Sequence, residues 1–142
     1  HYILTTNSFL FKISRNDTNL CNLCKIEEET IYHLLWQCPI VQDLINSFFN
    51  FCNTRGIMVP RDPCTFIFGV CLQPNCKNLF SILLVLKAYI YRKRCLDEKL
   101  SFQGLLGDIK THITTLKYIA TKNGRLSYFN KEWGPWLFLC RL

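Results

Sequence analysis

Apolar residues recur three or four positions apart along most of the chain, which is the spacing of one face of an α-helix. One such stripe, within residues 40–53, is made of Val41, Leu44, Ile45, Phe48 and Phe49. A second, within residues 102–122, is made of Ile109, Ile113, Leu116 and Ala120. The apolar segment 78–99 lies between them. We therefore expect a mostly α protein in which a bundle of about four helices follows the amino-terminal part.

The remaining segments carry weaker patterns. Residues 3–13 have a short apolar face that predicts a helix. Residues 27–37 predict another, with three glutamates in its first turn, where the helix dipole favours negative charge, and with Pro39 directly beyond its end. The apolar segment 65–72 predicts a strand or a buried turn, and residues 123–136 predict a turn followed by an aromatic cluster.

A glycine and two prolines mark one internal boundary. We expect residues 1–57 to form a zinc-knuckle module with its following helix, and residues 58–142 to form a basic helical region. The two could also form one domain, because 142 residues are enough for a single hydrophobic core. The chain begins with His1 and has Met58 as its only methionine, so we interpret it as the carboxy-terminal piece of a longer protein.

Positive charge is concentrated in the second half of the chain, although the net charge of the whole is only +7. Residues 1–63 hold 5 basic and 6 acidic side chains, net −1, whereas residues 64–142 hold 12 and 4, net +8. This distribution favours a polyanionic partner, most often nucleic acid, although basic faces also arise for solubility alone. The most apolar run, 79–91, is shorter than the ~20 residues of a membrane span, so we expect a buried helix and no membrane partner.

Residues 20–39 bring together four side chains of metal-binding type. Their spacing is Cys21-x2-Cys24-x8-His33-x4-Cys38. Three thiolates and one imidazole are a common tetrahedral ligand set for Zn²⁺. On an intact helix His33 and Cys38 would face different ways, so the helix must end between them. Pro39 supplies the reason, because it disfavours helical dihedral angles at Cys38.

A full set of four protein ligands leaves no open position for water, so we expect a structural zinc ion rather than a catalytic one. The alternative is a group of core cysteines with one hydrogen-bonded histidine. The chain has nine cysteines, and this odd number argues against the disulfide framework of a small secreted protein.

The same segment resembles the zinc-binding region that follows the reverse transcriptase in polyproteins of non-LTR (LINE-type) retrotransposons. The shared pattern is a TTN-x-FLFK lead-in, an LC-x-LC pair and then E-T-x-x-HLLW-x-CP, from Leu4 to Pro39. "FIFGV", "YIYRKRC" and a closing F-x-x-x-W extend it more loosely. The resemblance implies the zinc ligands Cys21, Cys24, His33 and Cys38. It also implies an upstream reverse transcriptase domain in the same polyprotein as a partner, and an intracellular, nuclear location.

No catalytic pattern accompanies the metal ligands. The sequence has no Y/F-x-D-D carboxylate pair, no Gly-rich phosphate loop and no nucleophile–base signature. We therefore expect no enzymatic activity from this chain, while the resemblance implies that its parent protein is an RNA-directed DNA polymerase.

Cations and one aromatic ring gather near the end of the helix expected at 78–99. Lys87, Tyr91 and Arg94 share one face, and Arg92 and Lys93 flank it. Positive charge for phosphates and a ring for stacking are typical of contacts to single strands or RNA loops. We therefore predict that these five residues bind nucleic acid, RNA or DNA. A solvated helix face is the alternative.

Other candidate residues receive simpler interpretations. Lys110 and Lys117 share a polar helix face that we interpret as solvated, with their stems lying along the surface. Trp36 lies beside the metal ligands, and we expect it to pack in the small core there.

Two functions follow from this sequence. The first is a zinc-stabilised accessory domain that grips template RNA or target DNA beside the polymerase. The second is a structural or protein-interaction module that packs against the polymerase without touching nucleic acid. A decayed copy with no present role is a third possibility.

Overall fold

The computed structural model describes residues 4–69 and 77–141, and within them it forms helices and no strand. The helices are α1 (Asn7–Lys12), η1 (His33–Gln37), α2 (Pro39–Asn53), α3 (Pro63–Phe68), α4 (Lys77–Leu96), α5 (Phe102–Lys122), α6 (Leu126–Trp133) and η2 (Gly134–Arg141). The element η1 is a π-helical turn and η2 is a 3₁₀ helix. The predicted mostly α fold, with a small cysteine–histidine module ahead of a helical bundle, is confirmed.

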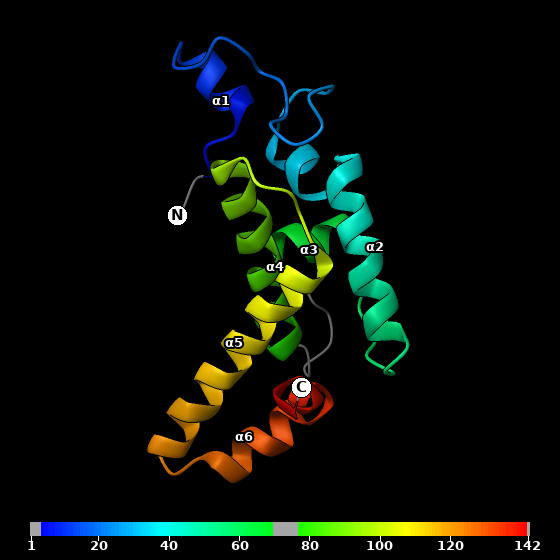
Figure 1. The fold of residues 1–142 in the computed structure, drawn as a ribbon, viewed down its shortest axis with the longest axis vertical. Coiled ribbons are helices and arrows are strands. Elements are labelled where there is room, and N and C mark those ends of the chain that lie inside the picture. Colours follow the sequence, from blue (N-terminus) through cyan, green and yellow to red (C-terminus); the bar gives the residue numbers. More distant parts are fainter. Residues whose placement is uncertain (1–3, 70–76, 142) are drawn as a thin grey trace.

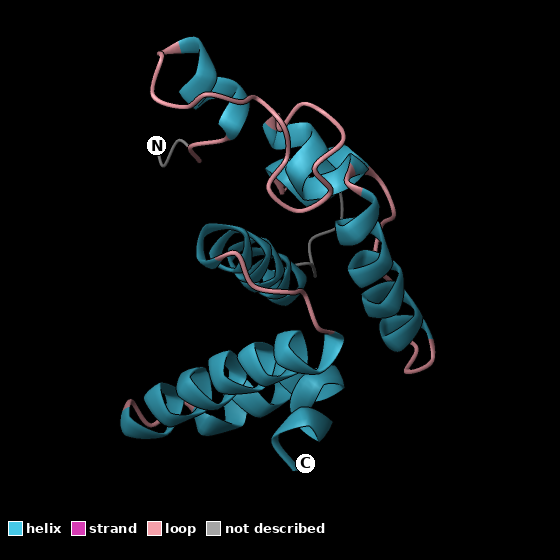
Figure 2. Ribbon diagram, turned by 45° about the horizontal axis from the view of Figure 1, so that its top comes forward, coloured by secondary structure: helices cyan, strands magenta, loops and turns pink. Residues whose placement is uncertain are grey.

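Helix α4 lies at the centre of the molecule (Figures 1 and 2). The segment that contains the predicted metal ligands lies above it together with α1, and the hairpin of α5 and α6 lies below it. Helix α5 packs against α4, α6 and η2, and α2 packs against η1 and α5. None of the described helices combines the length and apolar character that a membrane span needs.

The hydrophobic stripes predict the buried faces well. All five apolar residues of the predicted α2 stripe are buried, as are Ile109 and Ile113 of α5, while Leu116 and Ala120 are half-buried. One continuous apolar core draws on both predicted modules, from Cys21 near one end of the chain to Leu139 near the other. The division at residue 57 stays a prediction.

The expected strand or buried turn at 65–72 is instead a short helix as far as residue 68. Pro63 occupies the first position of α3, and the Asp62 carboxylate accepts a hydrogen bond from the Thr65 N–H (2.9 Å). Gly69 ends the helix with a φ of 69°, a left-handed conformation that favours glycine. These capping signals outweigh the β-branched residues in so short a segment. Residues 70–72 lie outside the described part of the chain.

The helix expected at 27–37 begins later than predicted, so the three glutamates are not in its first turn. Glu28 instead forms an isolated antiparallel bridge with Leu20. The Cys21 N–H donates to the Glu27 carbonyl (2.8 Å), and the Glu29 N–H donates to the Asn19 carbonyl (2.8 Å). This pairing closes the cysteine turn and delays the helix. The predicted turn after α5 is present, and its aromatic cluster lies on two further helices, α6 and η2.

A buried ion pair joins the amino-terminal segment to α4. The Glu29 carboxylate accepts hydrogen bonds from Nε (3.1 Å) and Nη2 (2.5 Å) of Arg94. It also accepts the backbone N–H groups of Asn7 and Asn22, each at 2.8 Å. Glu29 is fully buried and Arg94 is 7% exposed, so the pair depends on these hydrogen bonds to offset the loss of hydration.

Removing one partner of this pair tests its importance. We expect Arg94→Met to lower the free energy of unfolding by about 3–5 kcal/mol, because it leaves the Glu29 carboxylate buried without its counter-ion. The matched control is Arg92→Met, which breaks the exposed pair with Asp108 and should cost about 0–1 kcal/mol. Urea denaturation of the metal-loaded protein gives both values. Equal losses in the two variants would contradict the role assigned to Glu29 and Arg94.

Candidate metal centre

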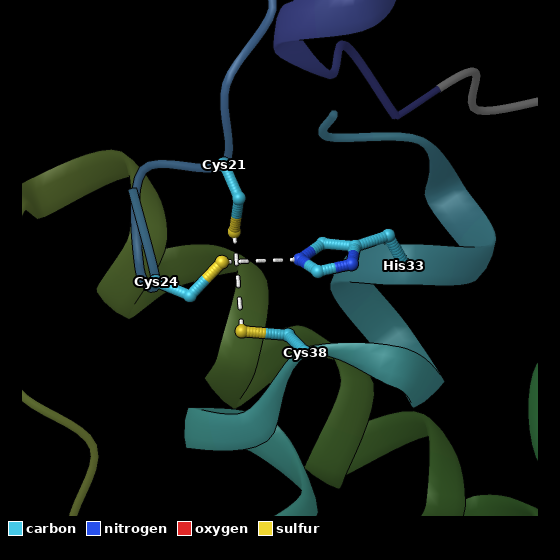
Figure 3. Close-up of side chains that lie close together, drawn as sticks. All are labelled: Cys21, Cys24, His33 and Cys38. Carbon is cyan, nitrogen blue, oxygen red and sulfur yellow. Dashed lines mark hydrogen bonds between the residues drawn. The ribbon is translucent and has the colours of Figure 1, made fainter. Parts of the chain in front are cut away.

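The four predicted ligands converge on one point (Figure 3). Their ligand atoms all lie within 4.8 Å of one another. The sulfur atoms of Cys21 and Cys38 are 3.9 Å apart, and the Cys24 sulfur is 3.4 Å from Nε2 of His33. Ligands at the corners of a tetrahedron, with metal–sulfur bonds of about 2.3 Å and a metal–nitrogen bond of about 2.1 Å, would be about 3.8 Å and 3.6 Å apart. The group is therefore placed to hold a metal ion.

These distances also exclude the simplest alternative for this pair of cysteines. A disulfide bond joins its sulfur atoms at about 2.05 Å. At 3.9 Å, Cys21 and Cys38 are free thiols that share a hydrogen bond. The separations of the three thiols and the imidazole therefore fit ligands of one shared metal ion better than a disulfide bond.

A tight turn positions the first two ligands. The Lys25 N–H donates to the Cys21 carbonyl (2.9 Å), and the Leu23 N–H points at the Cys21 sulfur (3.4 Å). Lys25 adopts a left-handed conformation with a φ of 62°. This turn brings Cys24 back toward Cys21, so that both sulfurs face the centre of the group.

A widened helical turn positions the other two. The Cys38 N–H donates to the His33 carbonyl (2.7 Å), a bond across five residues that is typical of a π-helix. Cys38 then leaves the helical region, with φ −58° and ψ 125°, as expected before Pro39. The predicted helix end between His33 and Cys38 is thus confirmed. The π-turn adds to it by placing both side chains on the same side.

Burial and hydrogen bonding polarise the sulfur atoms. Cys21 and Cys38 are fully buried, His33 is 4% exposed and Cys24 is half-buried. The hydrogen bond with Cys38, together with burial, raises the pKa of Cys21 far above its usual value. The same hydrogen bond lowers the pKa of Cys38, with help from the N–H groups of Val41 and Ile40 at the start of α2. A bound metal ion would displace the thiol protons, because cysteine binds metals as the thiolate.

Trp36 lies in the π-turn, between the third and fourth ligands in the sequence. Its ring is half-buried and packs against Phe66 of α3, with ring centroids 5.5 Å apart. This contact supports the core role expected for Trp36.

The five residues predicted to bind nucleic acid do not form one open surface. Lys87 donates to the Ile67 carbonyl (2.9 Å), and burial lowers the pKa of Lys87. The Tyr91 hydroxyl lies 2.8 Å from the Thr5 hydroxyl and 3.2 Å from the Thr5 carbonyl oxygen, to which it donates. Both side chains are thus directed toward other parts of the protein.

The remaining three form ion pairs. Arg92 contacts Asp108 at 2.8 Å, and Lys93 contacts Glu98 at 2.5 Å. Arg94 is buried against Glu29, which argues against its predicted contact with nucleic acid. For the other four residues that contact stays a prediction.

No known protein family, curated protein or solved structure matches this chain. The metal centre is therefore assigned from its own geometry, and the retrotransposon resemblance stays a prediction that rests on the motif.

Cobalt substitution tests the coordination directly. We expect Co²⁺ to give intense visible bands and thiolate charge-transfer bands, because a tetrahedral site with three sulfur ligands produces both. Cys24→Ser should weaken these bands, since it removes one ligand. Cys64→Ser is the matched control, because Cys64 is exposed and outside the group, and it should leave the spectrum unchanged. Weak, octahedral-type bands in the unmodified protein would contradict a four-ligand site.

Proposed function

We propose that this chain is a zinc-stabilised nucleic-acid-binding module, an accessory domain that grips template RNA or target DNA beside a reverse transcriptase. The observation that carries the proposal is the convergence of three sulfurs and one imidazole nitrogen within 4.8 Å. Zinc is the metal that this set favours, because soft thiolates in tetrahedral geometry select it over Mg²⁺ and Ca²⁺.

The zinc ion would organise the amino-terminal half. Its ligands come from two turns, 21–24 and 33–38, and within the described residues the one isolated bridge, Leu20 with Glu28, closes the first turn without joining it to the second. The second turn leads directly into α2, because Cys38 is the residue before the helix. Binding of the ion would therefore stabilise the cysteine turn and the start of α2 together.

Nucleic-acid binding is supported by charge. The metal-binding half is close to neutral, whereas residues 64–142 have a net charge of +8 from 12 basic and 4 acidic side chains. The four metal ligands are all protein side chains, so the zinc has no open position and the module would bind rather than catalyse. The motif resemblance supplies the polymerase context.

The test is a titration of labelled RNA and DNA with zinc-loaded protein at several salt concentrations. Fluorescence anisotropy measures the fraction of nucleic acid that is bound. We expect binding at low salt. The logarithm of the binding constant should fall linearly with the logarithm of the salt concentration, because phosphate contacts release counterions. Failure to bind either nucleic acid at low salt would contradict the proposal.

A second candidate function, docking onto the polymerase domain, is favoured by one specific surface. A hollow of about 460 Å³ lies between α1, α3 and the segment before η1. Its lining includes the exposed apolar side chains of Phe9, Ile31, Tyr32 and Phe68. Phe68 is 76% exposed, and together with its apolar neighbours it forms a contiguous exposed patch of the kind that marks interaction sites.

Sedimentation of the isolated chain tests this docking function. We expect the uncovered hollow to cause self-association, and we expect Phe9→Ser with Phe68→Ser to restore a monomer. Met58→Ser is the control, since Met58 is 90% exposed but lies outside this hollow. A monomer in the unmodified protein at high concentration would argue against the docking candidate.

A further inference from the structure

The hairpin of α5 and α6 carries positive charge that the fold does not neutralise. Between Asp108 and Glu132 the sequence contains no acidic residue. It contains five basic ones, Lys110, Lys117, Lys122, Arg125 and Lys131. Lys122 and Arg125 flank the turn between the helices, Lys131 lies in the last turn of α6, and all three are exposed.

The three cations near the end of α4 differ from those of the hairpin. Arg92, Lys93 and Arg94 each form an ion pair with a carboxylate. None of the five hairpin cations forms an ion pair with any residue that the structure describes. A polyanion would therefore meet uncompensated charge on the hairpin, whereas on α4 it would have to compete with existing partners.

The turn between the helices is fixed by its own hydrogen bonds. Backbone N–H groups of Asn123, Gly124 and Arg125 donate to carbonyls in the last turns of α5 at 3.0, 3.2 and 2.8 Å. Gly124 has a φ of 67°, which permits the tight reversal. The turn lies at the end of the molecule remote from the metal-binding segment (Figure 1). Lys122 and Arg125 are thus held at a protruding, ordered tip.

Two exposed tyrosines accompany these cations. Tyr118 is 62% exposed and Tyr128 is 65% exposed. Tyr118 lies one helical turn before Lys122, whose Nζ is 5.5 Å from the tyrosine ring centroid. Tyr128 follows Arg125 by three residues. Exposed rings among cations that have no carboxylate partner match a single strand, which offers both phosphates and unstacked bases. A duplex would offer mainly its phosphates.

From this combination we infer that the α5–α6 tip, defined as Tyr118, Lys122, Arg125 and Tyr128, binds single-stranded nucleic acid. The inference rests on the proposed nucleic-acid-binding function. It places the contact at a different site from residues 87–94, on which the sequence pattern had focused.

The experiment compares two double variants that remove the same charge. The tip variant is Lys122→Gln with Arg125→Gln, and the control is Lys12→Gln with Arg15→Gln, two exposed cations of the amino-terminal half. Each lowers the net charge by two. Binding of labelled single-stranded RNA, single-stranded DNA and duplex DNA is measured from low to high salt by fluorescence anisotropy. Circular dichroism melting confirms that both variants fold.

We expect the tip variant to reduce the slope of log affinity against log salt by about 1.4, or about 25-fold in affinity at 0.1 M salt, because two phosphate contacts are lost. The control should keep the slope of the unmodified protein. Tyr118→Ala should weaken single-strand binding by about fivefold or more, while Tyr118→Phe should retain it, because stacking needs only the ring.

The contrary outcomes are distinct. If the unmodified protein binds no nucleic acid, the proposed function fails and the inference fails with it. If it binds but the tip variant behaves like the control, the proposed function stands and the tip is the wrong site. Tighter binding to the duplex than to either single strand would also overturn the inference. RNA and DNA single strands that bind alike would support recognition through phosphates and bases alone.

Discussion

The structure depends on the convergence of four ligand atoms from two short turns. Cys21 and Cys24 come from a loop with little regular structure, and His33 and Cys38 come from a single π-turn. Hydrogen bonds between neutral thiols are weak, so they could not by themselves hold these turns together. A metal ion would replace them with four strong bonds. We therefore infer that the amino-terminal half is organised around that ion.

The Glu29–Arg94 pair connects the metal-binding segment to the central helix. Glu29 accepts the N–H of Asn22, inside the cysteine turn, and also binds Arg94 near the end of α4. Arg94 donates in turn to the Asn7 side chain at 2.9 Å. The cysteine turn, α1 and the central helix therefore share one buried polar network. Such a network favours a single arrangement of these segments. It is also sensitive to substitution, because losing one member leaves the others buried without hydrogen-bond partners.

Much of this arrangement could be predicted from the sequence, and the exceptions have physical reasons. The stripe of α2 and the ligand spacing were informative because both depend on local geometry. The helix at Pro63–Phe68 was missed although Asp62, Pro63 and Gly69 provide its start and stop signals. The partner of Arg94 could not have been predicted, because Glu29 lies 65 positions away. The sequence placed Arg94 correctly on a helix face, but only the tertiary structure shows that this face is covered.

The most direct test of the central claim is the mass of the intact, folded chain under native conditions. The account predicts one zinc ion per chain, with three protons displaced from the cysteine ligands, and a mass shift that disappears on acidification. Well-folded protein whose native mass corresponds to the metal-free chain, even after purification with added zinc, would contradict it. The convergence of Cys21, Cys24, His33 and Cys38 would then be a feature of core packing alone.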